Sequence, residues 1–250
     1  MRIAAQWILC VLSATGVSAE PVRLSGSITI TNDYRFRGVS QSDGDPAVQA
    51  NIEANASSGV YAGLWGSSVS GTALSGGVAE VDGYVGYRQT RGSISTDFGV
   101  QIYSAPDARS GSGHSRAEAY ASVDYTLPKL STDVRLGTAI APKQGQYPHT
   151  TLYDYVDVAQ PVPTTPLTLR AHLGYTLAGG GSGPSLPPIN TTDHLDYEFG
   201  LAYVWHKLTA TVSAVGTDIS PARAQSYSLG SASVRTATKP RLIVALTARF

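Results

Sequence analysis

Apolar and polar residues alternate along most of this chain, in segments of about ten residues that are separated by turn-forming residues. A clear example places Leu208, Ala210, Val212 and Ala214 between Thr209, Thr211 and Ser213. Successive side chains of a β-strand point to opposite faces, so each segment has one apolar and one polar face. Helical spacing is not evident after residue 19, and the pattern predicts an all-β fold.

About twelve segments show this pattern or a weaker form of it. They lie near residues 23–39, 47–56, 60–68, 79–89, 93–103, 115–126, 130–140, 150–160, 167–177, 193–205, 207–217 and 239–250. Their lengths suit tilted strands that cross a bilayer, which need roughly 9–11 residues. The segments near 60–68 and 150–160 alternate poorly, so the sequence leaves the facing of their side chains open.

The connections between these segments alternate between short and long. Tight connections are expected at 57–59, 90–92, 127–129 and 205–207, whereas 40–46, 69–78, 104–114, 178–192 and 218–238 are longer. Bacterial membrane barrels have an even number of strands, short periplasmic turns and longer outer loops. The chain is therefore predicted to form a transmembrane antiparallel β-barrel with both ends in the periplasm. A soluble β-sandwich would also bury one face of each strand and is the competing fold.

The N-terminus predicts export. Arg2 precedes an apolar run over residues 3–17, and Val17-Ser18-Ala19 fits a signal-peptidase site, so cleavage is expected after Ala19. Removal of residues 1–19 deletes the single cysteine, which leaves no disulfide or thiolate metal site. The domains expected are a signal peptide, 1–19, and a barrel, 20–250, in the outer membrane of a Gram-negative bacterium.

The charge balance excludes one class of partner. The chain holds 18 basic and 18 acidic residues, and residues 1–19 contain only one of them, Arg2. Proteins that bind nucleic acids normally carry a clear basic excess, so no nucleic acid is expected as a partner. No segment after residue 19 offers the roughly 20 apolar residues of a spanning helix.

The two faces of the segments predict which side chains meet lipid and which meet the lumen. The apolar faces carry residues such as Ile28, Ile30, Tyr34 and Phe36 in the first segment, and Ile94, Phe98, Val100 and Ile102 in the fifth. A basic residue on the lipid face would cost roughly 2–4 kcal/mol at mid-bilayer, so the charged residues are predicted to point inward. The predicted pore-lining residues are Arg35, Arg37, Glu53, Glu80, Asp82, Arg88, Asp97, Glu118, Asp124, Asp133, Arg135, Arg170, His172, Asp196, Glu198, Arg241 and Arg249, with Arg116 belonging to the same face.

Three stretches near the N-terminus carry a family resemblance. They are residues 31–49 (TNDYRFRGVSQSDGDPAVQ), 58–67 (SGVYAGLWGS) and 79–87 (AEVDGYVGY). Together with a C-terminal Phe250, they resemble the TorF family, a proteobacterial family of conserved hypothetical proteins described as porins. The resemblance is close over roughly residues 25–90 and loose beyond, and Asn32 stands where the family more often has serine. It implies a membrane barrel of porin type and no particular solute.

The first of these stretches predicts an ionic contact in the wall. If the first strand continues through residue 39, Asp33, Arg35 and Arg37 share one face and Tyr34 and Phe36 the other. Arg35 and Arg37 are then expected to meet carboxylates of neighbouring strands, with Glu53 the nearest candidate. Residues 42–46 read as a turn. Replacing both arginines by Gln should shift ion selectivity towards cations if they line the pore.

The C-terminus predicts recognition by the barrel-assembly machinery. Phe250 follows Leu242, Val244, Leu246 and Ala248 at alternate positions, which resembles the assembly signal of bacterial barrels.

No catalytic or metal-binding constellation stands out. His114, His149, His172, His194 and His206 are scattered and lack the spacing of zinc ligands. The run at 179–184 is a glycine-rich loop rather than a phosphate-binding loop, because neither a helix nor the P-loop lysine follows.

The expected function is therefore passive diffusion of small hydrophilic solutes or ions through a narrow, charge-lined lumen, without a cofactor and without an enzymatic reaction. The expected partners are outer-membrane lipid, the assembly machinery and the permeant solute. Two alternatives stay open: a closed structural or adhesion barrel that acts through its outer loops, and a lipid-modifying barrel enzyme. The sequence also leaves open whether an outer loop folds inward.

Overall fold

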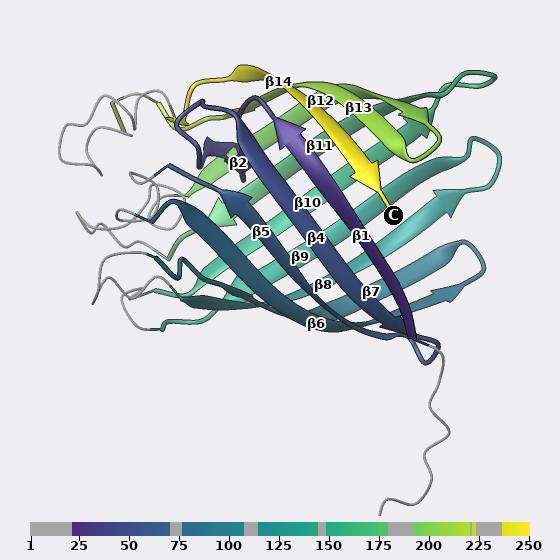
Figure 1. Cartoon of the computed structure of the whole chain (residues 1–250), viewed down its shortest axis with the longest axis horizontal. Coiled ribbons are helices and arrows are strands. Elements are labelled where there is room, and N and C mark those ends of the chain that lie inside the picture. Colours follow the sequence, from purple (N-terminus) through teal and green to yellow (C-terminus); the bar gives the residue numbers. More distant parts are fainter. Residues whose placement is uncertain are drawn as a thin grey trace, which may run out of the picture.

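Twelve antiparallel strands close into a single barrel in the computed structural model (Figure 1). The structure describes residues 22–70, 77–107, 115–144, 149–179, 193–220, 222–223 and 237–250, so the predicted signal peptide at 1–19 and most of the glycine-rich loop lie outside it. The wall strands are β1 (Val22–Thr31), β4 (Ala47–Ala56), β5 (Val60–Ser68), β6 (Ala79–Arg91), β7 (Ile94–Tyr103), β8 (Arg116–Leu127), β9 (Thr132–Ala141), β10 (Thr151–Pro161), β11 (Leu167–Leu177), β12 (His194–Trp205), β13 (Leu208–Thr217) and β14 (Arg241–Arg249). Two further strands, β2 (Arg35–Phe36) and β3 (Val39–Ser40), form a separate small hairpin. The predicted all-β barrel of twelve wall strands is confirmed.

The barrel closes between its first and last strands. β1 pairs with β4 on one side and with β14 on the other, with Ser27 opposite Arg249. Every other wall strand pairs with its neighbours in the chain, which is the simplest up-and-down order for a closed sheet. Closure leaves no strand edge with unpaired backbone groups, which is a requirement inside a bilayer.

The outer surface of the wall is apolar. Ile28, Ile30, Phe98, Val100 and Ile102 are among the large apolar side chains that are well exposed, as the alternation predicted. Exposure of so many apolar side chains around a closed barrel fits a lipid-facing surface. The inner surface therefore carries the polar face of each strand. Among the described residues, no helix is long and apolar enough to cross a membrane.

The cavities inside the barrel show which side chains of β5 and β10 point inward, a point that the sequence left open. Tyr61 and Trp65 of β5 line an inner cavity, and Tyr153 and Tyr155 of β10 line another. Asp154, between the two tyrosines, occupies an outward position, where its carboxylate accepts a hydrogen bond from Thr138 Oγ1 at 2.6 Å.

The short connections lie at one end of the barrel, the end at which β1 begins (Figure 1). Gly59 makes the first of them possible, because its φ of 98° lies in a region that side chains disfavour. Its backbone N–H donates to Ala56 O at 3.0 Å and closes the turn. The long connections follow β1, β5, β7, β9, β11 and β13 and therefore leave the opposite end.

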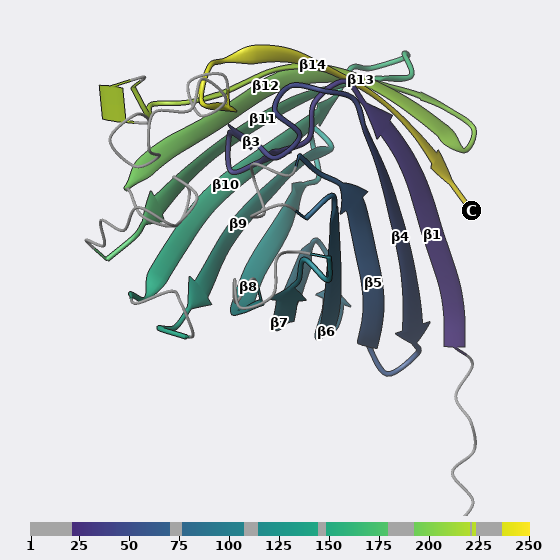
Figure 2. The same cartoon turned by 60° about the vertical axis from the view of Figure 1, so that its left-hand side comes forward.

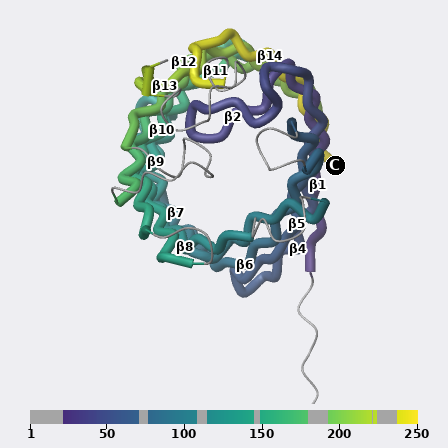
Figure 3. Tube along the Cα trace, turned by 90° about the vertical axis from the view of Figure 1, so that its left-hand side faces the viewer, coloured from purple at the N-terminus to yellow at the C-terminus, as the bar shows by residue number. Residues whose placement is uncertain are grey.

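The first of the long connections folds into the barrel. β1 ends at Thr31, and residues 32–46, here called the inner segment, turn away from the wall and cross the lumen (Figures 2 and 3). The prediction of one continuous strand to residue 39 is wrong for residues 32–39. The alternation there is real, but it describes a hairpin that is surrounded by the barrel: Arg37 and Gly38 have φ values of 49° and 77° and reverse the chain between β2 and β3.

Candidate functional site

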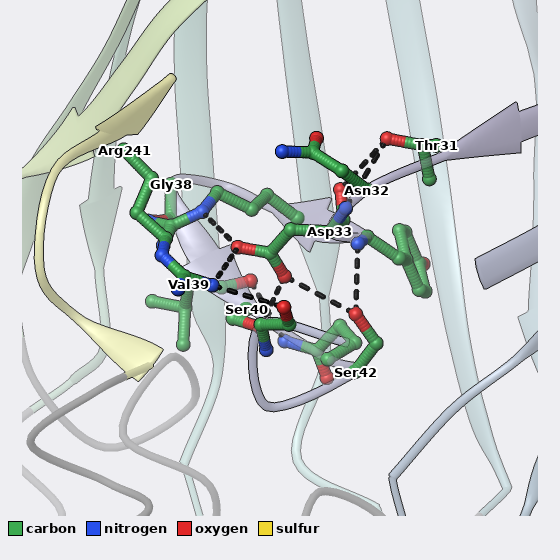
Figure 4. A network of polar contacts seen from close by, with 12 residues as sticks. Thr31, Asn32, Asp33, Gly38, Val39, Ser40, Ser42 and Arg241 are labelled. Carbon is green, nitrogen blue, oxygen red and sulfur yellow. Dashed lines mark hydrogen bonds and ion pairs between the residues drawn. The ribbon is translucent and has the colours of Figure 1, made fainter. Parts of the chain in front are cut away.

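Asp33 anchors the inner segment. Its carboxylate is 1% exposed and accepts hydrogen bonds from Arg35 Nε at 2.9 Å, from Ser42 Oγ at 3.1 Å and from Ser40 Oγ (Figure 4). The guanidinium of Arg241, on the last strand, lies 3.9 Å away. A carboxylate that accepts several hydrogen bonds in a buried place holds its partners in one arrangement. Asp33 thus fixes the hairpin as a unit.

Arg37 ties the hairpin to the far wall. Its guanidinium donates to Glu118 on β8, and both side chains are buried. The same guanidinium lies 4.0 Å from the ring centroid of Tyr153 on β10 and 4.9 Å from that of Phe36. Burial opposes the charged form, but the Glu118 carboxylate outweighs it and raises the pKa of Arg37 above its usual value. Arg37 is therefore held as a cation within the lumen.

Aromatic packing places the other face of the inner segment. Tyr34 contacts Trp65 of β5 with ring centroids 5.3 Å apart, and Phe36 contacts Tyr103 of β7 at 5.5 Å. The Tyr34 hydroxyl donates to Glu80 on β6 at 3.0 Å. Burial raises the pKa of Tyr34 well above its usual value, so this hydroxyl stays a donor. The prediction that Tyr34 and Phe36 face lipid is wrong, because both side chains lie inside the barrel, where they contact Trp65, Tyr103 and Glu80.

The predicted contact of Arg35 and Arg37 with Glu53 is wrong. Arg35 binds Asp33 and the carbonyl of Gly38, and Arg37 binds Glu118. Glu53 lies opposite Ser25, towards the other end of β1, and the inner segment leaves the wall at Thr31. Glu53 instead pairs with Arg88, whose Nη1 is 3.6 Å from its carboxylate, and accepts a hydrogen bond from the Tyr84 hydroxyl at 3.1 Å.

Arg116 joins the group of Arg37 and Glu118, with its Nη2 4.0 Å from the Glu118 carboxylate, and the strand register brings the other predicted lumen residues into three further ionic groups and a few separate positions. Arg88 joins Glu53 and Asp97, with 3.0 Å from its Nη2 to Asp97. Arg135 Nε donates to Asp124 at 2.7 Å, and Thr126 donates to Asp133 nearby. His172 lies between two carboxylates, with Nδ1 2.7 Å from Asp157 and Nε2 3.0 Å from Asp196. The remaining predicted residues occupy separate inward positions: Arg170, Glu80, Asp82, Glu198, Arg249 and Arg241. Glu198 accepts a hydrogen bond from Ser213, Arg249 donates one to Thr209, and Arg241 lies beside Asp33.

Tyrosines were the main lumen residues that sequence reasoning missed. Tyr61, Tyr84 and Tyr120 lie inside, with the Tyr61 hydroxyl 2.5 Å from both Asp97 and the Tyr120 hydroxyl. Five of the inner tyrosine rings lie over a glycine of an adjacent strand and shield the backbone that the glycine leaves uncovered. The pairs are Tyr61 on Gly86, Tyr84 on Gly63, Tyr120 on Gly99, Tyr153 on Gly174 and Tyr155 on Gly137. A signal was present for Tyr84 and Tyr120, which occupy polar-face positions, whereas Tyr61, Tyr153 and Tyr155 lie in the two segments whose facing the sequence left open.

The inner segment narrows the lumen without filling it. A cavity of about 600 Å³ extends from the inner segment to β8 and β10–β14. A second, of about 420 Å³, lies against β4–β8, and a third, of about 300 Å³, lies beside Arg135 and Arg170. The first cavity shares Tyr34 and Trp65 with the second, and His172 with the third, so the three are neighbours within one lumen.

The closed barrel, its apolar outer surface and its polar lumen define a transmembrane β-barrel of porin-like architecture. The chain belongs to a bacterial family of proteins of unknown function, Gcw_chp, whose model matches residues 15–250. A comparison with curated proteins finds no match.

Solved structures are similar to this chain at low sequence identity. The NanC porin is similar with a TM-score of 0.54 and 11% identity, over 91% of this chain and 99% of the porin. An outer-membrane channel of the COG4313 group from Pseudomonas putida F1 has a TM-score of 0.49 and 12% identity, over 91% of this chain and 95% of the channel. The likeness to the NanC porin is one of fold.

Proposed function

We propose that this protein is an outer-membrane channel of a Gram-negative bacterium, through which small hydrophilic solutes or ions diffuse passively. The observation that carries the proposal is the set of neighbouring cavities beside the inner segment, lined by charged and tyrosine side chains. Inward-folded backbone is tolerated at membrane depth where it borders a water-filled space. A lumen with charges of both signs lowers the barrier for small polar solutes.

The remaining expectations from the sequence belong to this proposal. They are membership of the TorF family, removal of residues 1–19, recognition of Phe250 by the assembly machinery, and passage without a cofactor or an enzymatic step. The predicted pore-lining set is retained with one change of role. Arg35 and Arg37 hold the inner segment in place, because they form ion pairs with Asp33 and Glu118.

One alternative has an observation in its favour. The inner segment is fixed by buried ion pairs at both Asp33 and Arg37, which is also what a permanently closed barrel would need. A structural barrel of this kind would present its outer loops and pass no current. No such support exists for a lipid-modifying enzyme, since the described contacts of His172 are to Asp157, Asp196 and Tyr153 inside the lumen.

The test is single-channel conductance of refolded residues 20–250 in planar bilayers. Folding is checked first by the gel shift between unheated and boiled samples. Discrete and reproducible current steps are expected. A folded barrel that produces no steps, while a known porin prepared in the same way does, would overturn the channel proposal in favour of the closed barrel.

A further inference from the structure

Two neighbouring carboxylates inside the barrel have no cationic partner among the described residues. Glu80 and Asp82 lie two positions apart on β6, so both point into the lumen, and neither forms an ion pair there. Asp82 is 2% exposed, and its Oδ2 accepts a hydrogen bond from Gln101 Nε2 at 2.9 Å. Its Oδ1 is buried without a hydrogen-bond partner of ordinary geometry. A buried carboxylate in this condition is costly unless a cation reaches it.

The space beside Asp82 is lined by aromatic rings. The cavity of about 420 Å³ is bordered by Asp82, Trp65, Tyr103, Tyr61, Tyr84 and Tyr120. Trp65 lies directly opposite Asp82 in the strand register, and the inner segment covers this end through Tyr34 on Trp65 and Phe36 on Tyr103. Aromatic faces attract cations, and a carboxylate among them supplies the counter-charge.

The protein already uses this chemistry once in the same cavity. The guanidinium of Arg88 lies 4.4 Å from the ring centroid of Tyr61 and pairs with Asp97 at 3.0 Å. A cation held between a ring and a carboxylate is thus stable at the other end of the cavity. The Asp82 end has the ring and the carboxylate but no cation of its own among the described residues.

We propose that this cavity binds a small organic cation of the alkylammonium or quaternary ammonium class. The Asp82 carboxylate is its counter-ion, and Trp65 and Tyr103 provide the ring faces. The other two carboxylates of this cavity, Glu53 and Asp97, are already paired with Arg88, and rings lie beside Asp82, which favours an organic cation over a metal ion. The proposal deepens the channel function, on which its meaning as a solute site rests, by naming the class of solute.

The test uses Trp65 as its own reporter. In residues 20–250 the tryptophans are Trp65 and Trp205, and Trp205 lies on the exposed outer face, so Trp205→Phe leaves Trp65 alone. The folded W205F barrel is titrated with choline chloride at constant ionic strength, and in parallel with 3,3-dimethylbutan-1-ol, an uncharged molecule of the same shape. A saturable change in Trp65 emission is expected with choline and not with the alcohol.

The matched variants are Asp82→Asn and Asp133→Asn in the W205F background. Asp133 is also a lumen carboxylate, but it does not line this cavity. D82N should weaken choline binding by roughly tenfold or more, because the counter-charge is lost, and D133N should not. If D82N shows no heat-dependent gel shift, Tyr103→Leu replaces it, which keeps the carboxylate, removes a ring and is expected to weaken binding as well.

An equal response to choline and to the alcohol, or unchanged choline binding in the folded variant, would overturn the site. Because emission is read without current, the two proposals fail separately. A barrel that binds choline but carries no current would refute the channel and leave the cation site standing. A barrel that carries current but does not bind choline would refute the cation site and leave the channel standing.

Discussion

The ring of Phe250 lies against the backbone of Gly26, so close that a Cβ on Gly26 would stand 2.6 Å from the ring Cζ. The two residues also exchange both backbone hydrogen bonds, each at 3.0 Å. This contact extends the β1–β14 pairing beyond Arg249 and completes the seam at which the sheet closes on itself. The C-terminal residue therefore has a structural role in closure, in addition to the assembly role that we propose for it.

Gly26→Ala should weaken closure. The new methyl group would meet both the Phe250 ring and the carbonyl of Asn51, and backbone cannot move aside easily. We expect a smaller fraction of barrel that resists unfolding in unheated gels and a lower temperature of the gel shift. Gly83→Ala is the control, because the nearest atom to its Cβ is a leucine methyl group at 3.7 Å. Equal behaviour of both variants would contradict a special role of the Gly26–Phe250 contact.

Glu118→Gln should destabilise the barrel more than removal of the whole ion pair. The single change leaves the buried Arg37 cation without its carboxylate, and breaking buried pairs in this way typically costs about 3–5 kcal/mol. The double variant Arg37→Met/Glu118→Gln also removes the Arg37 charge, so only Arg116, whose Nη2 lies 4.0 Å from Glu118, loses this carboxylate, and part of the loss should be recovered. The measurement is the free energy of unfolding in guanidinium chloride for all members of the cycle. Additive losses would mean that the two residues act independently.

Asp33→Asn should loosen the inner segment and enlarge the pore. The amide cannot accept all the hydrogen bonds from Arg35, Ser40 and Ser42 that the carboxylate accepts. We expect a higher and noisier single-channel conductance. Asp154→Asn changes an outward carboxylate that accepts a hydrogen bond from Thr138 and does not contact the inner segment, so it should leave the conductance level nearly unchanged. If the conductance of D33N and its current noise were the same as in the parent protein, Asp33 would not be what holds the inner segment in the lumen.

Arg170→Gln should shift ion selectivity towards cations. Arg170 lines the lumen near Arg135 and forms no ion pair among the described residues, so in the proposed channel its charge would act on permeating ions without a fixed counter-charge. The reversal potential in a KCl gradient measures the shift. Arg91→Gln is the control, because Arg91 ends β6 at an outward position opposite Ile94. An equal shift in both variants would point to surface charge rather than to the lumen.

The barrel itself could be predicted because one face of each strand meets lipid and the other meets polar groups. Ile28 and Ile30 revealed β1, and the same alternation, continued through Tyr34 and Phe36, was mistaken for the same strand. Alternation reports that two faces differ, but not whether the apolar face meets lipid or another ring such as Trp65. The partner of Arg37, at Glu118, is 81 residues away, and no local pattern contains that contact. Lumen tyrosines were missed because their rings suit both the membrane interface and a glycine on the next strand.

The position of the inner segment in the chain has a consequence for the order of events during folding. It directly follows the first strand, yet the residues that hold it, Glu118 on β8, Tyr153 on β10 and Arg241 on β14, come from the middle and the end of the chain. The segment is therefore made early and acquires its partners late. Docking of the inner segment and pairing of β1 with β14 should therefore be coupled. A barrel in which β1 and β14 are paired should also be one in which the inner segment is bound inside the lumen.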